Sequence, residues 1–89
     1  KLIFDSFTDL ERGYDFGRVE IRVSAGSWQV MRELTDRRSW RTIRLDIDPY
    51  VPLGSSFQLR FRMTSDHSLE QDGWFLNRIA VIAPLSLKR

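Results

Sequence analysis

The chain has 89 residues, enough for one domain with a thin core, and its 42% hydrophobic and 29% charged residues exclude a largely disordered chain. The formal net charge is +2, from 14 basic and 12 acidic residues that are interleaved, so the sequence lacks the one-sided basic face typical of nucleic-acid binding. Cysteine is absent, which excludes disulfides and thiolate metal sites, and no apolar run approaches the roughly 20 residues that membrane insertion of a helix needs.

Polar and apolar residues alternate along most of the chain, with the period of two that half-buried β-strands require. The alternation is clear in Val19, Ile21 and Val23 and again over residues 57–64. No segment keeps a period of about 3.6 long enough to form a helix. In chain order, the pattern predicts strands at residues 2–9, 17–24, 28–34, 40–47, 56–64 and 73–82.

Turn-forming residues lie between the predicted strands. Residues 24–27 (Ser-Ala-Gly-Ser) fit a short hairpin. Pro49 and Pro52 cannot continue a central strand, because proline lacks the backbone donor. Short strands at regular spacing with such turns predict an all-β sandwich or barrel.

The last predicted strand breaks its own alternation. Trp74 and Leu76 share one parity, whereas Ile79 and Val81 share the other. A β-bulge near residues 77–78 would add one residue and let all four side chains face the core. A strand buried on both faces is the alternative.

The largest side chains at expected core-facing positions define the predicted core. Its members are Val19, Trp40, Leu45, Leu59, Phe61 and Trp74. Trp40 and Trp74 are placed inside because each begins a strand at core-facing parity and large aromatic residues dominate thin cores. Trp28 and Tyr50 then remain as the candidates for an exposed ligand-binding surface.

The carboxylates that could carry chemistry lie beside turns. Glu11 and Asp15 flank the turn after the first strand and Asp72 precedes a glycine, positions that favour acidic side chains for backbone hydrogen bonding. His67 is the only histidine, and the sequence offers it no partner for a zinc site or for acid–base catalysis. We therefore expect that the protein is not an enzyme and has no catalytic residue. A calcium ion held by Glu11, Asp15 and Asp72 is the alternative, if their loops converge. The D-x-D-x-D-G pattern of a calcium loop is absent.

Two segments carry a resemblance to a known family. The first, residues 9–21, reads DLERGYDFGRVEI, and the second, residues 72–81, reads DGWFLNRIAV. Between them, Trp40 precedes an apolar strand and RFR follows at residues 60–62. This order resembles the jelly-roll accessory domain of bacterial immune inhibitor A-type metallopeptidases, and the related MAM-like and cleaved-adhesin modules of exported bacterial proteins, over nearly the whole chain.

The resemblance implies an antiparallel β-sandwich of jelly-roll type over residues 1–89, with a binding or architectural role. The sequence departs from the family where an acidic pair, which helps to hold a structural cation in related modules, is replaced by Asn77 and Arg78. The family also has strands upstream of the one matching residues 2–9. We therefore expect this chain to be the C-terminal part of a domain, or a module of a longer chain.

The combined prediction is a non-catalytic interaction or architectural module of a secreted or cell-surface protein. Its expected partner is another protein chain, or the rest of its own parent chain, joined at an open sheet edge by β-augmentation. Two alternatives stay open: a carbohydrate-binding module with a glycan as partner, and an accessory fragment of a secreted metallopeptidase. An exposed aromatic pair lining a groove would favour the glycan.

Overall fold

The structure is a computed structural model that describes residues 1–65 and 73–82. Each of the six predicted strands is present, with bounds that differ from the prediction by three residues at most. The strands are β1 (Leu2–Asp9), β2 (Phe16–Val23), β3 (Gln29–Leu34), β4 (Arg37–Leu45), β5 (Phe57–Thr64) and β6 (Gly73–Val81).

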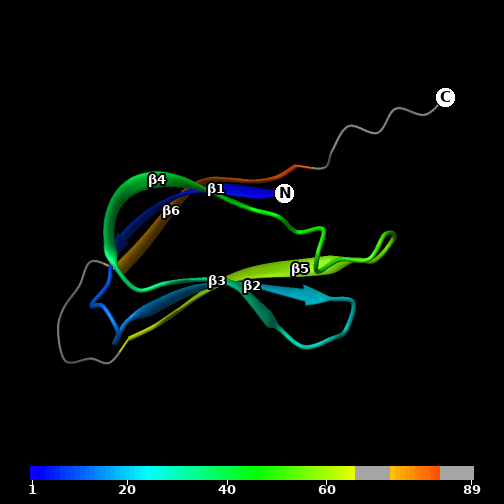
Figure 1. Ribbon diagram of the computed structural model, residues 1–89, viewed down its shortest axis with the longest axis horizontal. Helices are drawn as coiled ribbons and strands as arrows, with labels where there is room; N and C mark the ends of the chain where they lie inside the picture. The colour runs from blue at the N-terminus through cyan, green and yellow to red at the C-terminus, as the bar shows by residue number, and fades with distance from the viewer. Residues whose placement is uncertain (66–72, 83–89) are drawn as a thin grey trace.

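The strands form two three-stranded antiparallel sheets, with orders β4-β1-β6 and β3-β2-β5. Only β2 and β3 are consecutive neighbours within one sheet, and every other connection passes from one sheet to the other. The two layers lie one above the other in Figure 1. This arrangement confirms the predicted all-β antiparallel sandwich of jelly-roll type.

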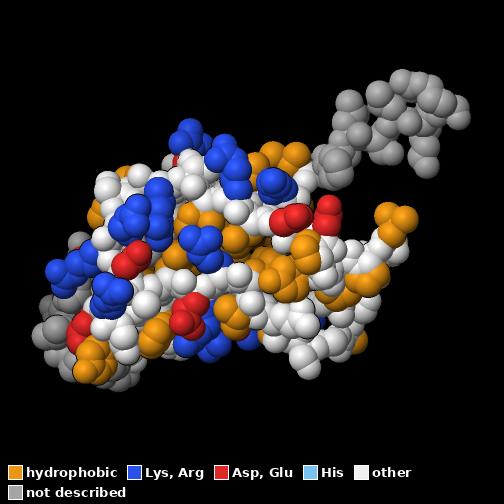
Figure 2. All heavy atoms as spheres, in the orientation of Figure 1, with side chains coloured by type: hydrophobic (Ala, Val, Ile, Leu, Met, Phe, Trp, Pro, Cys, Tyr) orange, Lys and Arg blue, Asp and Glu red, His pale blue; other side chains and the backbone are white. Residues whose placement is uncertain are grey.

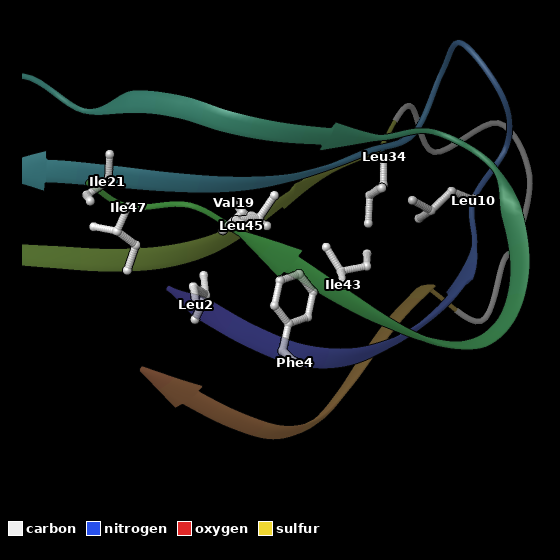
Figure 3. Packing of buried hydrophobic residues seen from close by; sticks show 9 residues of the cluster. All are labelled: Leu2, Phe4, Leu10, Val19, Ile21, Leu34, Ile43, Leu45 and Ile47. Carbon is white, nitrogen blue, oxygen red and sulfur yellow. The ribbon is translucent and has the colours of Figure 1, made fainter. Parts of the chain in front are cut away.

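The core lies between the two sheets and follows the predicted alternation. Leu2 and Phe4 of β1 point toward Val19 and Ile21 of β2, as Figure 3 shows. The ring of Phe4 also meets the ring of Phe61 edge to face, with centroids 5.2 Å apart. The buried hydrophobic residues are Leu2, Phe4, Leu10, Val19, Ile21, Leu34, Ile43, Leu45 and Ile47.

Most of the predicted core residues lie where the sequence placed them. Val19 and Leu45 are buried, and Leu59, Phe61 and Trp74 are half-buried and pack against the buried cluster.

Trp40 is the exception, and its assignment to the core is wrong, because its side chain is 53% exposed. Trp40 has the parity of Thr42 and Arg44, the polar side of β4, rather than the parity of Ile43 and Leu45. The sequence-based assignment gave Trp40 core-facing parity, which the exposed positions of Thr42 and Arg44 contradict.

The bulge predicted in the last strand is present. Asn77 pairs with Asp5 and Ala80 pairs with Ile3, so Arg78 and Ile79 together oppose one residue of β1. Arg78 takes a left-handed conformation, with φ of 50°. The extra residue brings the second half of β6 onto the core-facing side, as predicted. Because β6 is an edge strand, Ile79 and Val81 nevertheless remain 51% exposed on that side.

Trp74 joins the two sheets. Its Nε1–H donates a hydrogen bond to Ser6 Oγ at 2.9 Å, and its ring lies 5.7 Å from the ring of Phe61, centroid to centroid. The same indole covers Gly17 of β2 so closely that a Cβ on this glycine would lie 2.8 Å from Trp74 Cε3. Gly17 is therefore the residue that lets an indole fit between the sheets.

Candidate binding surface

The predicted cation ligands do not form a metal site within the described residues. Asp15 is buried and its Oδ2 accepts a hydrogen bond from the Glu11 N–H at 2.9 Å. The Glu11 carbonyl accepts hydrogen bonds from the Tyr14 and Asp15 N–H groups, which closes the turn after β1. Asp72 and His67 lie outside the described residues. Residues 1–65 and 73–82 contain no group of three histidine, aspartate or glutamate residues able to hold a metal ion.

The two aromatic residues predicted for a ligand-binding surface do not come together. Trp28 is half-buried beneath the guanidinium groups of Arg22 and Arg60, which lie 5.1 Å and 4.2 Å from the centre of its ring. Tyr50 is half-buried too, and it packs against the core. Both therefore interact mainly with their own chain.

The outer face of the β3-β2-β5 sheet is covered by ion pairs. Glu20, buried on this face, accepts hydrogen bonds from Arg60 at 2.6 Å and from Arg62 at 3.0 Å. The hydrogen bond from Arg62, together with that from Arg60 and the two positive charges, outweighs the effect of burial and lowers the pKa of Glu20 to about 2. Arg18 pairs with Glu33 on the same face, at 2.9 Å. These partners satisfy one another, so this face presents few groups to a ligand.

The outer face of the β4-β1-β6 sheet is different, because three aromatic rings lie in a row across its three strands. We call Trp40 of β4, Phe7 of β1 and Phe75 of β6 the aromatic row. The Phe7 ring lies 5.8 Å from that of Trp40 and 6.0 Å from that of Phe75, centroid to centroid. Phe7 is half-buried between its neighbours, whereas Trp40 and Phe75 are 53% and 48% exposed.

Sequence reasoning missed the aromatic row, although one signal was present. Phe7 and Phe75 both have the parity opposite to the core residues of their strands, beside polar positions. An aromatic residue at an outward position on each of two strands indicates an exposed aromatic surface. Their alignment with Trp40 depends on β1 lying between β4 and β6, which no local pattern reveals.

A polar recess of about 330 Å³ adjoins the aromatic row beside Trp40. Asp5 lies in it and accepts hydrogen bonds from Thr42 Oγ1 at 2.9 Å and from Arg78 Nε at 2.6 Å. The Thr42 hydrogen bond, followed by the Arg78 hydrogen bond, lowers the pKa of Asp5, so the carboxylate is charged at neutral pH. Arg78 is the left-handed residue of the β6 bulge, so the bulge supplies one wall of the recess.

The fold and this surface define an all-β sandwich with one aromatic outer face. Comparison with protein-family models, with curated proteins and with solved structures finds no match to the chain. The family resemblance of the sequence therefore stays a prediction. The part of the chain that the structure describes contains no helix able to span a membrane.

Proposed function

We propose that this domain is a non-catalytic interaction module whose partner is a protein chain, either a separate one or another part of its own parent protein. One observation carries the proposal: the Phe7 ring lies against the rings of Trp40 and Phe75 across a sheet face, and the two outer rings are about half exposed. The proposed location, secreted or cell-surface, rests on the family resemblance alone.

Exposed aromatic residues grouped with arginine are typical of protein interfaces. Tryptophan, phenylalanine and arginine are enriched there, and a few such residues carry most of the binding energy. Arg78 and the exposed Arg44 lie on the same sheet face as the aromatic row, at its polar rim. The partner that fits has an apolar patch for the rings, bordered by carboxylates for the arginines.

The tilt of the rings favours a protein over a sugar. The Phe7 ring is inclined by 50° to that of Trp40 and by 68° to that of Phe75. The aromatic row is therefore ridged, and a ridged apolar surface fits interdigitating side chains better than the flat face of a sugar ring.

A glycan is the second candidate, and one observation favours it. The half-exposed indole of Trp40 adjoins the recess that contains Asp5, Thr42 and Arg78. An aromatic face beside a few convergent polar groups is a common arrangement in small-ligand sites. This candidate needs only Trp40 and the recess, whereas the protein candidate needs Phe75 as well.

The test combines partner isolation with direct affinity measurement. Extracellular proteins retained by the wild-type domain are identified, each is purified, and its Kd is measured for the wild type, Trp40→Ala, Phe75→Ala and Tyr14→Ala. Tyr14, 60% exposed in the turn after β1, is the matched control for loss of an exposed aromatic residue. We expect Trp40→Ala and Phe75→Ala each to weaken binding by about tenfold or more, and Tyr14→Ala to leave it unchanged.

A parallel titration with a panel of oligosaccharides separates the two candidates. Saturable sugar binding that Trp40→Ala abolishes and Phe75→Ala spares would replace the protein proposal with the glycan one. Partners that bind the wild type, Trp40→Ala and Phe75→Ala equally would exclude the aromatic row as the interface.

A further inference from the structure

A second surface feature lies where the chain passes from β3 to β4. It is a cleft of about 770 Å³ between the turn after β1, the end of β3 and the start of β4. Basic side chains gather at this end of the molecule, as Figure 2 shows. Five arginines line the cleft: Arg12, Arg32, Arg37, Arg38 and Arg41.

The carboxylates in and beside the cleft offset only part of this positive charge, with Arg37 paired to Asp9 at 3.1 Å and Arg41 to Asp36 at 3.5 Å. Glu33 binds Arg18, its neighbour across the β2–β3 pairing on the outer face of the sheet. Asp36 accepts a hydrogen bond from Thr8 Oγ1 at 3.0 Å. With Glu11, the lining holds three acidic residues against five basic ones, so the cleft is positively charged.

Arg41 makes the cleft a site rather than a charged surface. Arg41 lies opposite Ser6 of β1 in the strand register, on the core-facing side of β4, and its side chain is only 23% exposed. Its Nε and Nη2 atoms are shielded from solvent and have no hydrogen-bond acceptor among the described residues. Asp36 Oδ2 lies 3.5 Å from Nη2, which gives an ion pair without a well-formed hydrogen bond.

An oxyanion would satisfy these donors. Leaving buried cationic donors without acceptors is unfavourable, whereas a guanidinium binds the oxygens of a carboxylate, sulfate or phosphate in a two-pronged geometry. Arg32 and Arg38, exposed on the two strands that border the cleft, can contribute further positive charge. We propose that the cleft between β3 and β4 binds an oxyanion group of a ligand, with Arg41 as its central contact.

The experiment follows the arginine Nε–H resonances of the ¹⁵N-labelled domain by NMR. The probes are sodium sulfate, sodium phosphate and sodium glutarate, each compared with sodium chloride at matched ionic strength. We expect the Arg41 Nε–H resonance to shift saturably with at least one oxyanion and not with chloride. The anion that binds most tightly identifies the kind of group that the natural ligand carries.

Variants assign the site. Arg41→Gln should weaken the oxyanion by about tenfold or more, because it removes the central charged donor. Arg22→Gln, which removes the same charge from the outer face of the β3-β2-β5 sheet, is the matched control and should leave the affinity unchanged. If Arg41→Gln fails to fold, Arg32→Gln takes its place, with an expected loss of about threefold or more from charge alone. Shifts that stay linear with every salt, or equal losses in the Arg22→Gln control, would overturn the proposal.

Discussion

Replacing Gly17 with alanine tests how the two sheets are joined. The added Cβ would lie 2.8 Å from Trp74 Cε3 and 3.0 Å from two further ring carbons, whereas ordinary contacts begin at 3.4 Å. The indole must therefore retreat by several tenths of an ångström. It would have to give up part of its contact with Phe61 or its hydrogen bond to Ser6.

The expected loss follows from two opposing effects. Overpacking of a close-fitting site costs about 1–3 kcal/mol, while alanine gains about 0.4–1 kcal/mol over glycine by restricting the unfolded chain. We expect Gly17→Ala to lower the free energy of unfolding by about 1–2 kcal/mol. For a domain of this size, the melting temperature should then fall by about 4–16 °C.

A double-mutant cycle with Trp74→Leu isolates the contact. Urea denaturation followed by far-ultraviolet circular dichroism gives the free energy of unfolding for the four variants of the cycle. Without the indole the added methyl group meets no ring, so Gly17→Ala should be neutral or stabilising in the Trp74→Leu background. Equal losses in both backgrounds would refute the reasoning, because Gly17 would then be required for a reason other than Trp74.

Two further predictions concern buried carboxylates. Because the pKa of Glu20 falls from 4.5 to about 2 on folding, its ion pairs contribute stability above pH 4.5 that is lost as the pH falls toward 2. The loss should be about 1–2 kcal/mol, because solvent screens the half-exposed arginines. Urea midpoints measured against pH should show this loss in the wild type and not in Glu20→Gln. Parallel pH profiles of the two proteins would contradict the prediction. Asp15→Ala should lower the free energy of unfolding by about 1.5–3 kcal/mol, because the Glu11 N–H loses its carboxylate acceptor. Asp15→Asn should lower it by less. If both variants melt at the same temperature as the wild type, Asp15 does not have this role. A melting temperature that rises in millimolar calcium, and does so only with Asp15 intact, would instead support the cation alternative.

Local pattern was enough to predict the strands, most of the core and the β6 bulge. Parity along the strands places Val19, Leu45 and Phe61 inside, and the break in parity after Leu76 requires the extra residue. Each of these features depends on a few consecutive residues and on the pleat of a strand. The one wrong core residue, Trp40, was given core-facing parity although it shares the outward parity of Thr42 and Arg44.

The proposed binding surfaces were less predictable because they depend on pairing between distant segments. Phe7 and Phe75 are 68 positions apart and become neighbours only because β1 pairs with β6. Arg41 had a local signal, since it shares the core-facing parity of Ile43. Its position in a cleft follows from the crossing of the chain between sheets at Thr35 and Asp36, which no alternation of residues indicates.

The irregular pairing of the edge strands affects how readily copies of this domain associate through their sheet edges. The register shifts in β4 and β6 where they pair with β1, and it shifts again in β3 where it pairs with β2. An edge interrupted in this way is a poor template for aggregation, because an incoming strand cannot hydrogen-bond along its length. Of the four edge strands in the described residues, only β5 keeps an unbroken register, over all eight residues from Phe57 to Thr64. Stacking of one molecule onto another through backbone hydrogen bonds, whether in assembly or in misfolding, should therefore begin at β5.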